Sequence, residues 1–465
     1  MVSHGIFGGY DVRGVYGESL TEREALRLGK AFGTFVAKDC GAGKKRSPRI
    51  ACGRDNRPSS PSLFSAFAEG LRSTGCVVFN LGVVPSPVAY FGAFALQTDG
   101  AAVVTASHNP PKYNGIKMLS GIWPLSSAQL AEVKTIFESG EFAEKPRLAW
   151  GALHEKTVVE EYLRFACSKL ERVEGLKVVV DGANAVAGEV GVKLLKKLGA
   201  TVVALHCDLD GTFPNHLADP SKPENVRDLQ ALVLKEKADL GVAFDGDGDR
   251  SVFVDERGGI IKSDDANVLF IREILGKGKR GAVGFELRCS MVVREEIERL
   301  GGTAIETNAG RIAVRESMRN GAVFACESTG HVCFADNNGF DDGIFSSAKF
   351  CGLLKKGGAA SSLAATVKHY FATRELRFEC ERKFEAIESA EKALKARKLR
   401  LLTSDGVKYS DKSAWGLVRA SQTEPLLSAR FEGKTRKDLE RVYALFAGAM
   451  PSFAKLPPLE SVLQA

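Results

Sequence analysis

The sequence has few features that would place the protein outside a reducing compartment or within a membrane. Its ten cysteines include no C-x-x-C pair and no zinc-like spacing of cysteine and histidine. Cys52, Cys76 and Cys333 lie in apolar runs, where cysteine packs as a small hydrophobe. The N-terminal segment lacks an apolar core of signal-peptide length. One asparagine and two prolines interrupt the most apolar stretch, residues 77–97. We therefore expect a cytoplasmic protein that contacts no membrane.

The excess of one sign of charge over the other is also small. The chain has 64 lysines and arginines against 57 aspartates and glutamates, a formal net charge of +7. This mild bias suits a small anionic substrate. The basic clusters at 44–46 and 397–400 contain no aromatic side chains, so we expect no nucleic-acid partner.

Several motifs of nucleotide and hydrolase chemistry are missing. There is no Walker A motif, no G-x-G-x-x-G between a strand and a helix, and no G-x-S-x-G. These absences argue against a phosphoryl donor held in a P-loop and against a serine hydrolase.

What is present is a local pattern that occurs three times. A helix-like segment ends at a glycine and a β-branched strand follows, around Gly75, Gly199 and Gly301. Each copy is preceded by a strand and a polar turn, so each predicts a βαβ unit. The 465 residues suggest about three or four domains. One large doubly wound sheet is the alternative, but each copy carries its own polar loop, which favours separate domains.

The C-terminal part differs. It predicts a helix over 383–398, a hairpin at Asp405-Gly406, strands over 416–418 and 428–431, and a helix over 437–450. The predicted fold class is therefore α/β, with three related domains of mixed, largely parallel sheets, a smaller C-terminal α+β domain, and an active-site cleft between them. The predicted domain boundaries are 1–150, 151–255, 256–370 and 371–465.

The densest chemical signal is the segment DGDGDR, between two apolar runs. Asp245, Asp247 and Asp249 alternate with glycines, so their carboxylates can converge on one hard cation, and Mg²⁺ is favoured. An EF-hand is excluded, because Arg250 stands where that loop needs glycine and strands flank the segment. A solvated acidic turn is the remaining alternative.

A second signal follows the apolar run 101–104. Ser107 begins the segment SHNPP at a strand end, where active-site loops of open α/β sheets lie. A serine before Asn-Pro is commonly a turn residue. Lys117 follows closely, and a hydroxyl, an amine and a metal triad are the parts of a phosphoryl-transfer site.

Two further loops follow apolar strands. Glu327, Thr329 and His331 offer donors and acceptors suited to sugar hydroxyls, although a single histidine is more often structural. Arg419, with hydroxyls and loop amides in the segment RASQTEP, is a set of groups suited to an anion.

Taken together, these segments resemble one family along essentially the whole chain, the α-D-phosphohexomutases. Within the family the sequence is most similar to bacterial and archaeal phosphomannomutase/phosphoglucomutases. The resemblance rests on YDVRG, GRD, TASHNPPKYNGIK, DGDGDR, CESTGHVCF, FDDGIFSSAKF and WGLVRASQTEP, in that order.

The resemblance implies a role for each matching residue. Phosphorylated Ser107 and the three aspartates would hold Mg²⁺. The groups around the transferring phosphoryl would be Arg13, Lys117, Arg250 and His331, with His331 as candidate base. The expected substrate-binding residues are Tyr10, His108, Arg288, Arg311, Glu327, Thr329, Arg419, Ser421, Gln422 and Thr423.

The implied function is exchange of a phosphoryl group between hexose 1-phosphate and 6-phosphate, for mannose, glucose or both, through a hexose 1,6-bisphosphate. Thr329, Arg288 and Arg311 depart from the family's usual residues, and Thr423-Glu424-Pro425 also resembles phosphoglucosamine mutases, which is the alternative activity. A non-catalytic sugar-phosphate binding protein and a Mg²⁺-dependent phosphohydrolase are less favoured. A monomer or small homo-oligomer is expected.

Overall fold

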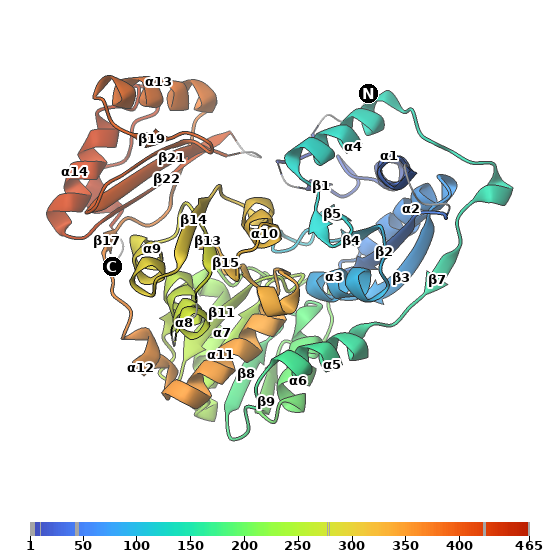
Figure 1. Ribbon diagram of the computed structural model, residues 1–465, viewed down its shortest axis with the longest axis horizontal. Coiled ribbons are helices and arrows are strands. Elements are labelled where there is room, and N and C mark those ends of the chain that lie inside the picture. The colour runs from blue at the N-terminus through green and yellow to red at the C-terminus, as the bar shows by residue number, and fades with distance from the viewer. Residues whose placement is uncertain are drawn as a thin grey trace.

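A computed structural model describes residues 5–9, 11–41, 46–276, 278, 280–421 and 425–463. Its strands form four separate sheets, each built from one continuous part of the chain. Figure 1 shows the four units in order of colour, from blue and teal through green and yellow to orange-red.

The first sheet has a parallel centre and antiparallel additions. Its central strand pairs in parallel with β3 and β4, and β4 pairs antiparallel with β5. Its strands are β1 (Val12–Val15), β2 (Arg49–Arg54), β3 (Val77–Val83), β4 (Gly100–Val104), β5 (Tyr113–Ser120), β6 (Trp123–Pro124) and β7 (Leu153–Glu155). The helices are α1 (Glu22–Gly41), α2 (Ser60–Ser73), α3 (Ser86–Ala95), α4 (Ser127–Ser139) and the 3₁₀ helix η1 (Arg147–Ala149). Ile50 and Cys52 pack toward α1 and α2 while Ala51 packs toward α3, so helices cover both faces.

The second sheet repeats this centre. Strand β8 is parallel to β9 and β10, and β11 is antiparallel to β10. Its strands are β8 (Lys177–Asp181), β9 (Thr201–Leu205), β10 (Leu240–Phe244), β11 (Ser251–Asp255) and β12 (Ile260–Ile261). The helices of this part are α5 (Val159–Lys169), α6 (Ala187–Lys197), η2 (Pro223–Val226) and α7 (Arg227–Glu236).

The third sheet has the same order again, β14-β13-β15-β16, with only the last pair antiparallel. Its strands are β13 (Ala282–Glu286), β14 (Thr303–Thr307), β15 (Phe324–Cys326) and β16 (Val332–Phe334). Its helices are α8 (Ser263–Leu275), α9 (Met291–Arg299), α10 (Arg311–Arg319), η3 (Ala335–Asn337), α11 (Gly343–Gly357) and α12 (Ala360–Ala364). One strand order in three sheets confirms three related α/β units.

The predicted glycine stops lie where each of these units turns from helix to strand. Gly75, Gly199 and Gly301 have φ values of 88°, 100° and 77°. They follow the ends of α2, α6 and α9 by two residues or fewer and precede β3, β9 and β14. Glycine reaches this left-handed region without steric cost, which is why it ends these helices.

The fourth sheet is wholly antiparallel, as expected for the smaller α+β domain predicted from the sequence. Its strands are β17 (Phe371–Ala372), β18 (Leu376–Glu379), β19 (Leu401–Leu402), β20 (Val407–Ser410), β21 (Ala414–Ala420) and β22 (Leu426–Gly433). Its helices are α13 (Lys383–Ala396), α14 (Arg436–Ala447) and η4 (Leu459–Ser461). The predicted hairpin at Asp405-Gly406 joins β19 to β20.

The exact domain boundaries stay a prediction. The proposed ends at 150 and 255 fall just before β7 and β12, which pair with the first and second sheets. Strands of two or three residues carry too short a hydrophobic pattern to be found in the sequence.

One hydrophobic cluster runs through the three α/β units, from Tyr90 in α3 to Phe350 in α11, whereas the C-terminal unit has its own cluster around Phe431. The nine cysteines whose side chains are described are all free. Among the described residues, no helix is long and apolar enough to cross a membrane.

Candidate functional site

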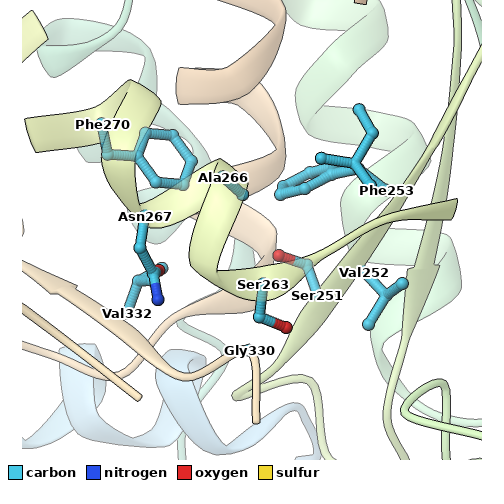
Figure 2. A pocket seen from close by; sticks show the side chains of 10 residues that line it. Ser251, Val252, Phe253, Ser263, Ala266, Asn267, Phe270, Gly330 and Val332 are labelled. Atoms are coloured by element: carbon cyan, nitrogen blue, oxygen red, sulfur yellow. The ribbon is translucent and has the colours of Figure 1, made fainter. Parts of the chain in front are cut away.

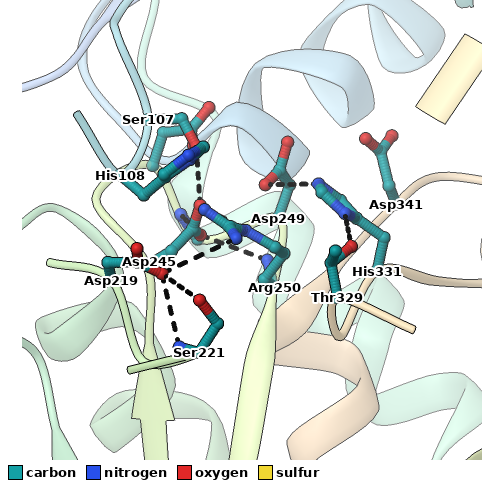
Figure 3. A network of polar contacts seen from close by, with 12 residues as sticks. Ser107, His108, Asp219, Ser221, Asp245, Asp249, Arg250, Thr329, His331 and Asp341 are labelled. Carbon is teal, nitrogen blue, oxygen red and sulfur yellow. Dashed lines mark hydrogen bonds and ion pairs between the residues drawn. The ribbon is translucent and has the colours of Figure 1, made fainter. Parts of the chain in front are cut away.

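Ser107 lies in the loop after β4 and is buried, with 4% of its surface exposed. Its φ of 51° is in the left-handed region that residues other than glycine rarely adopt. Its Oγ donates to Asp245 Oδ2 at 2.7 Å and lies 3.3 Å from His108 Nδ1. The strand end and the unusual backbone together present the serine hydroxyl to the second unit (Figure 3).

The three aspartates lie in the turn between β10 and β11, and all three are fully buried. One carboxylate oxygen from each lies within 4.8 Å of the others. Asp247 Oδ1 has no hydrogen-bond partner among the described residues. Burial, and then the charge of Asp249, raise the pKa of Asp245 to about 6. Oxygen-only ligands, mutual repulsion and an unpartnered buried oxygen fit a hard divalent cation such as Mg²⁺.

The glycine between the first two aspartates is required by the approach of the two loops. A Cβ at Gly246 would lie 2.2 Å from the carbonyl oxygen of Ser107. No side chain fits at this distance, so Gly246 lets the backbone of the aspartate loop touch the serine loop.

Two buried cations contact the triad. Lys117 Nζ, on β5, donates to Asp247 Oδ2 at 2.6 Å and to Asp249 Oδ2 at 2.5 Å. Arg250 Nε donates to Asp245 Oδ2 at 3.1 Å. Burial disfavours both charges, but the carboxylates outweigh it and raise the pKa of each group. These cations lie where a phosphoryl group on Ser107 would need its charge neutralised.

The third unit contributes the turn between β15 and β16. Thr329 Oγ1 donates to Glu327 Oε2 at 2.9 Å and lies 3.1 Å from His331 Nδ1. His331 Nε2 lies 3.2 Å from Asp249 Oδ1, so this turn reaches the aspartate loop (Figure 3). Glu327 Oε1 is buried without a hydrogen-bond partner among the described residues, as expected of a group that would bind a ligand.

The surroundings of His331 favour its protonated form. Burial alone would lower its pKa, but Asp249 and Glu327 raise it to about 10. An imidazolium donates a proton and does not accept one. The predicted role of His331 as base therefore requires neutralisation of the charge on Asp249, which a bound cation would supply.

The second predicted histidine has the opposite charge preference. The charge of Arg250, followed by burial and Arg13, holds the pKa of His108 well below its usual range. Arg13, on β1, donates to Asn109 Oδ1 and to Asp11 Oδ2, both at 2.8 Å. His108 is therefore neutral beside Ser107, and Arg13 is anchored to the same loop.

The predicted anion-binding residues Arg419, Ser421 and Thr423 form the proposed phosphate clamp. Arg419 reaches the third unit through one carboxylate. Arg419, at the end of β21, donates to Asp405 Oδ1 from Nε at 3.2 Å and from Nη2 at 3.0 Å. Asp405 Oδ2 in turn accepts from the backbone N–H of Ala309 at 3.0 Å. Ser421 follows on the same strand end. Tyr10, Gln422 and Thr423 lie outside the described residues.

Arg288 and Arg311 lie on the third unit's side of the site. Arg288 pairs with Glu286 and lies 3.3 Å from Glu375 Oε1. Arg311 Nη1 donates to Tyr90 OH at 3.2 Å, and its Nη2 is buried without a hydrogen-bond partner among the described residues. An unpartnered guanidinium nitrogen suits an anionic ligand.

Two cavities lie away from these side chains. A crevice behind the third unit's turn, lined by Phe253, Phe270 and Gly330 (Figure 2), has a volume of about 10 Å³, room for about one water. A groove of about 810 Å³ lies along α9, β19 and β20. Neither is lined by a predicted site residue.

Comparison with known families matches four models in succession. They are phosphoglucomutase/phosphomannomutase alpha/beta/alpha domains I, II and III, at residues 4–144, 158–259 and 262–371, and the C-terminal domain at residues 375–449. The phosphomannomutase/phosphoglucomutase of Pseudomonas aeruginosa is 35% identical over 446 residues, which are 95% of this chain and 94% of that protein. The chain belongs to this family.

Other relatives agree with this membership. A phosphoglucomutase of Neisseria meningitidis is 34% identical over 97% of this chain and 98% of its own length. A phosphoglucomutase/phosphomannomutase family structure from Burkholderia thailandensis has a TM-score of 0.89 and 33% identity, and covers 97% of both chains. The Aspergillus fumigatus N-acetylphosphoglucosamine mutase in complex with glucose 1,6-bisphosphate, at 14% identity and a TM-score of 0.62, shares the fold alone.

The fold of this family member brings most of the predicted residues together. Ser107, the aspartates, Arg250, Lys117 and the third unit's turn form one continuous network. Arg419 is joined to the third unit through Asp405 and not to Ser107. Sequence reasoning gave no role to Asp11, Tyr90, Asp341 and Asp405, which contact the arginines. Asp11 and Asp341 stand in the quoted segments YDVRG and FDDGIFSSAKF, but a sequence motif does not show which arginine each carboxylate pairs with in space.

Proposed function

We propose that this protein interconverts hexose 1-phosphates and hexose 6-phosphates, of mannose, glucose or both, through phosphorylated Ser107 and a hexose 1,6-bisphosphate. The observation that carries the proposal is the hydrogen bond from Ser107 Oγ to Asp245. The two residues are 138 positions apart in the sequence, and their contact places the candidate nucleophile at the buried aspartate triad. Membership of a family whose relatives are named phosphomannomutase/phosphoglucomutase supports the isomerase class.

The proposed reaction consists of two phosphoryl transfers, one from Ser107 to the sugar and one from the other end of the sugar to Ser107. In the first transfer the O–P bond at Ser107 breaks, a bond between phosphorus and the free sugar oxygen forms, and the proton of that sugar hydroxyl passes to the released Ser107 oxygen. The sugar is then a bisphosphate. In the second transfer the phosphoryl group at the other end of the sugar moves to Ser107, and the proton of the Ser107 hydroxyl passes to the sugar oxygen that is released, so that atoms and charge balance.

Individual residues support these steps through their positions. Lys117 and Arg13 would neutralise the transferring phosphoryl by preorganised charge. Arg250 orients Asp245, and Glu327 and Thr329 would bind sugar hydroxyls. His331 would exchange the proton with the sugar oxygen. Mg²⁺, held by the three aspartates and an oxygen of phosphorylated Ser107, would supply further charge neutralisation when bound.

The second phosphate of the substrate needs its own binding group. Arg419, Ser421 and Thr423 are proposed to hold it, because a guanidinium fork matches phosphate oxygens. Closure of the C-terminal unit over the substrate would exclude water, which otherwise hydrolyses the phosphoserine.

The test is a product analysis with mannose, glucose and glucosamine 1-phosphates side by side, with Mg²⁺ and glucose 1,6-bisphosphate. We expect isomerised sugar phosphate, a phosphoryl group on Ser107 by mass spectrometry, and a loss of at least about a thousandfold in turnover for S107A. S73A, at a buried serine of α2 that donates to the Gly70 carbonyl, is the control. Release of free phosphate as main product would instead show a phosphohydrolase.

A further inference from the structure

Arg57, in the turn between β2 and α2, is a fully buried arginine for which the mechanism has no use. It touches neither the aspartate triad nor the hydroxyl of Ser107. Its guanidinium instead points into the loop that carries Ser107, where every one of its N–H groups has a partner.

The guanidinium makes five hydrogen bonds, and four of them go to backbone carbonyls between Ser107 and Tyr113, the first residue of β5. Nη1 donates to the carbonyls of Pro110 at 2.7 Å and Tyr113 at 3.1 Å, and Nη2 to those of Ser107 at 2.6 Å and Asn109 at 2.7 Å. Nε donates to Asp55 Oδ2 at 3.0 Å. Four carbonyls turned toward one point would repel each other without a cation between them, so Arg57 stabilises a loop shape that the chain would otherwise avoid.

The loop shape concerned includes the unusual backbone of Ser107. The carbonyl that accepts from Arg57 Nη2 belongs to the residue with φ of 51°. A Cβ at Gly246 would lie 2.2 Å from the oxygen of this same carbonyl. Arg57 therefore holds the peptide group at which the serine loop meets the aspartate loop.

The neighbours of Arg57 also contact the second unit. The ring of Phe213 lies 5.1 Å from the guanidinium carbon, and Asn56 Nδ2 donates to the Asn184 carbonyl at 2.8 Å. A Cβ at Gly211 would lie 2.1 Å from the carbonyl oxygen of Asn56. These second-unit loops follow β8 and β9, beside the strand that ends at the aspartate triad.

We propose that Arg57 is the positioning residue of the phosphoryl-transfer site: it fixes the backbone of the Ser107 loop and, through the contacts of the turn it belongs to, the place of that loop against the aspartate-bearing unit. This inference rests on the proposed function. A lysine cannot replace it, because an ammonium has three donors in a compact group and cannot reach four carbonyls and a carboxylate in one plane.

The test compares R57K with R72K. Arg72, on α2 of the same unit, donates to the Gly151 carbonyl at 2.8 Å and is remote from the site, so R72K is the matched control. A displaced nucleophile costs about a hundredfold in rate. For R57K we expect that loss in kcat, less than about a threefold change in KM for the sugar phosphate, and faster amide hydrogen exchange confined to residues 105–113. Mg²⁺ binding should match that of R72K, whereas the unfolding temperature should fall below that of R72K, because buried carbonyls lose their donors.

A second variant covers the case in which R57K fails to fold. R57A leaves a guanidinium-sized space, and added guanidinium ion, but not ammonium ion, should restore part of kcat. Wild-type kcat in R57K, or a fall in kcat without faster exchange in 105–113, would overturn the positioning role. Absence of isomerase turnover in the wild type would instead refute the proposed function, while the exchange comparison would still decide whether Arg57 holds the loop.

Discussion

At the scale of single residues, the aspartate triad is an arrangement that is stable only with cations beside it. Three fully buried carboxylates share one turn, and Lys117 and Arg250 contact them. The unpartnered oxygen of Asp247 has no such compensation among the described residues. A buried acceptor without a partner is costly unless a ligand uses it.

We therefore expect D247N to lower Mg²⁺ affinity at least about tenfold, because the variant loses one charged ligand. Titration calorimetry measures this without reference to turnover. D208N, at an exposed aspartate of the same unit, should bind Mg²⁺ like the wild type. Chelator-treated wild type that turns over substrate without added metal would contradict the assignment of the triad.

A second residue-scale prediction concerns His216, which has no role in the proposed reaction. Its Nε2 is 3.1 Å from Asp181 Oδ2, a fully buried carboxylate. Burial lowers the pKa of His216, but the hydrogen bond and charge of Asp181 outweigh it, and the net pKa is raised. A raised pKa in the folded state means that protonation stabilises the fold.

This contribution is fully present below about pH 6.5, the ordinary pKa of histidine, and is lost as pH rises through the raised value. H216Q should therefore lower the unfolding temperature more at acidic than at alkaline pH. Thermal unfolding across this range measures the difference, with H154Q, at an exposed histidine on β7, as control. An equal effect of H216Q at both ends of the range would rule out the ion pair.

At the scale of elements, the site depends on loops that touch through backbone and not only through side chains. The contact of Gly246 with the Ser107 carbonyl is one of these. G246A must push the two loops apart, because neither atom belongs to a flexible side chain, at a cost of about 1–3 kcal/mol. We expect loss of most turnover and weaker Mg²⁺ binding, while the four units stay folded.

G352A is the matched control for this prediction. Gly352 lies within α11, and a Cβ there would meet nothing within 4 Å. It should leave kinetics and metal binding unchanged. Wild-type turnover in G246A would show that the loops can separate without harm, and that their close contact is not needed for transfer.

The elements that the sequence predicted best are those with both a long apolar run and a clear end signal. The βαβ units were readable because Gly75, Gly199 and Gly301 close helices at positive φ. The four polar loops could be placed because each follows an apolar strand. Short edge strands such as β7 and β12 have too few residues to show a periodic hydrophobic pattern. Arg57 could not be recognised from its local sequence, because the carbonyls that it binds lie about fifty residues further along the chain.

At the scale of the whole molecule, the three α/β units share one hydrophobic cluster, while the C-terminal unit is attached to the third by polar contacts and a small apolar cluster. Lys408 Nζ donates to the Leu287 carbonyl at 2.5 Å, and Arg430 Nη1 to the Arg288 carbonyl at 2.7 Å. Figure 1 shows this unit beside the third and apart from the first, which carries Ser107 in the loop after β4. Sequence patterns cannot predict such placement, because it depends on contacts between distant surfaces.

The separation suggests that the C-terminal unit binds substrate without taking part in the transfer at Ser107. Arg419 is its proposed phosphate-binding group, and Asp405 holds the guanidinium by two of its nitrogens. A mutase must hold the phosphate that is not reacting, whichever end of the sugar it is on. R419A should therefore raise KM for both the 1-phosphate and the 6-phosphate, by about tenfold to a hundredfold for the loss of hydrogen bonds to a charged group.

The phosphoserine and the metal affinity should survive in R419A, because Arg419 contacts neither loop. The variant should also release more bisphosphate, since the clamp would hold that intermediate while it reorients. D405N distinguishes direct phosphate binding by Arg419 from the supporting role of Asp405. This variant keeps the guanidinium but removes the charge that orients it, so the KM of D405N should rise less than that of R419A. Kinetics with both isomers and a trap for free bisphosphate measure these effects. An unchanged KM in R419A would assign the distal phosphate to Arg288 or Arg311, whose guanidinium groups lie on the third unit's side of the site.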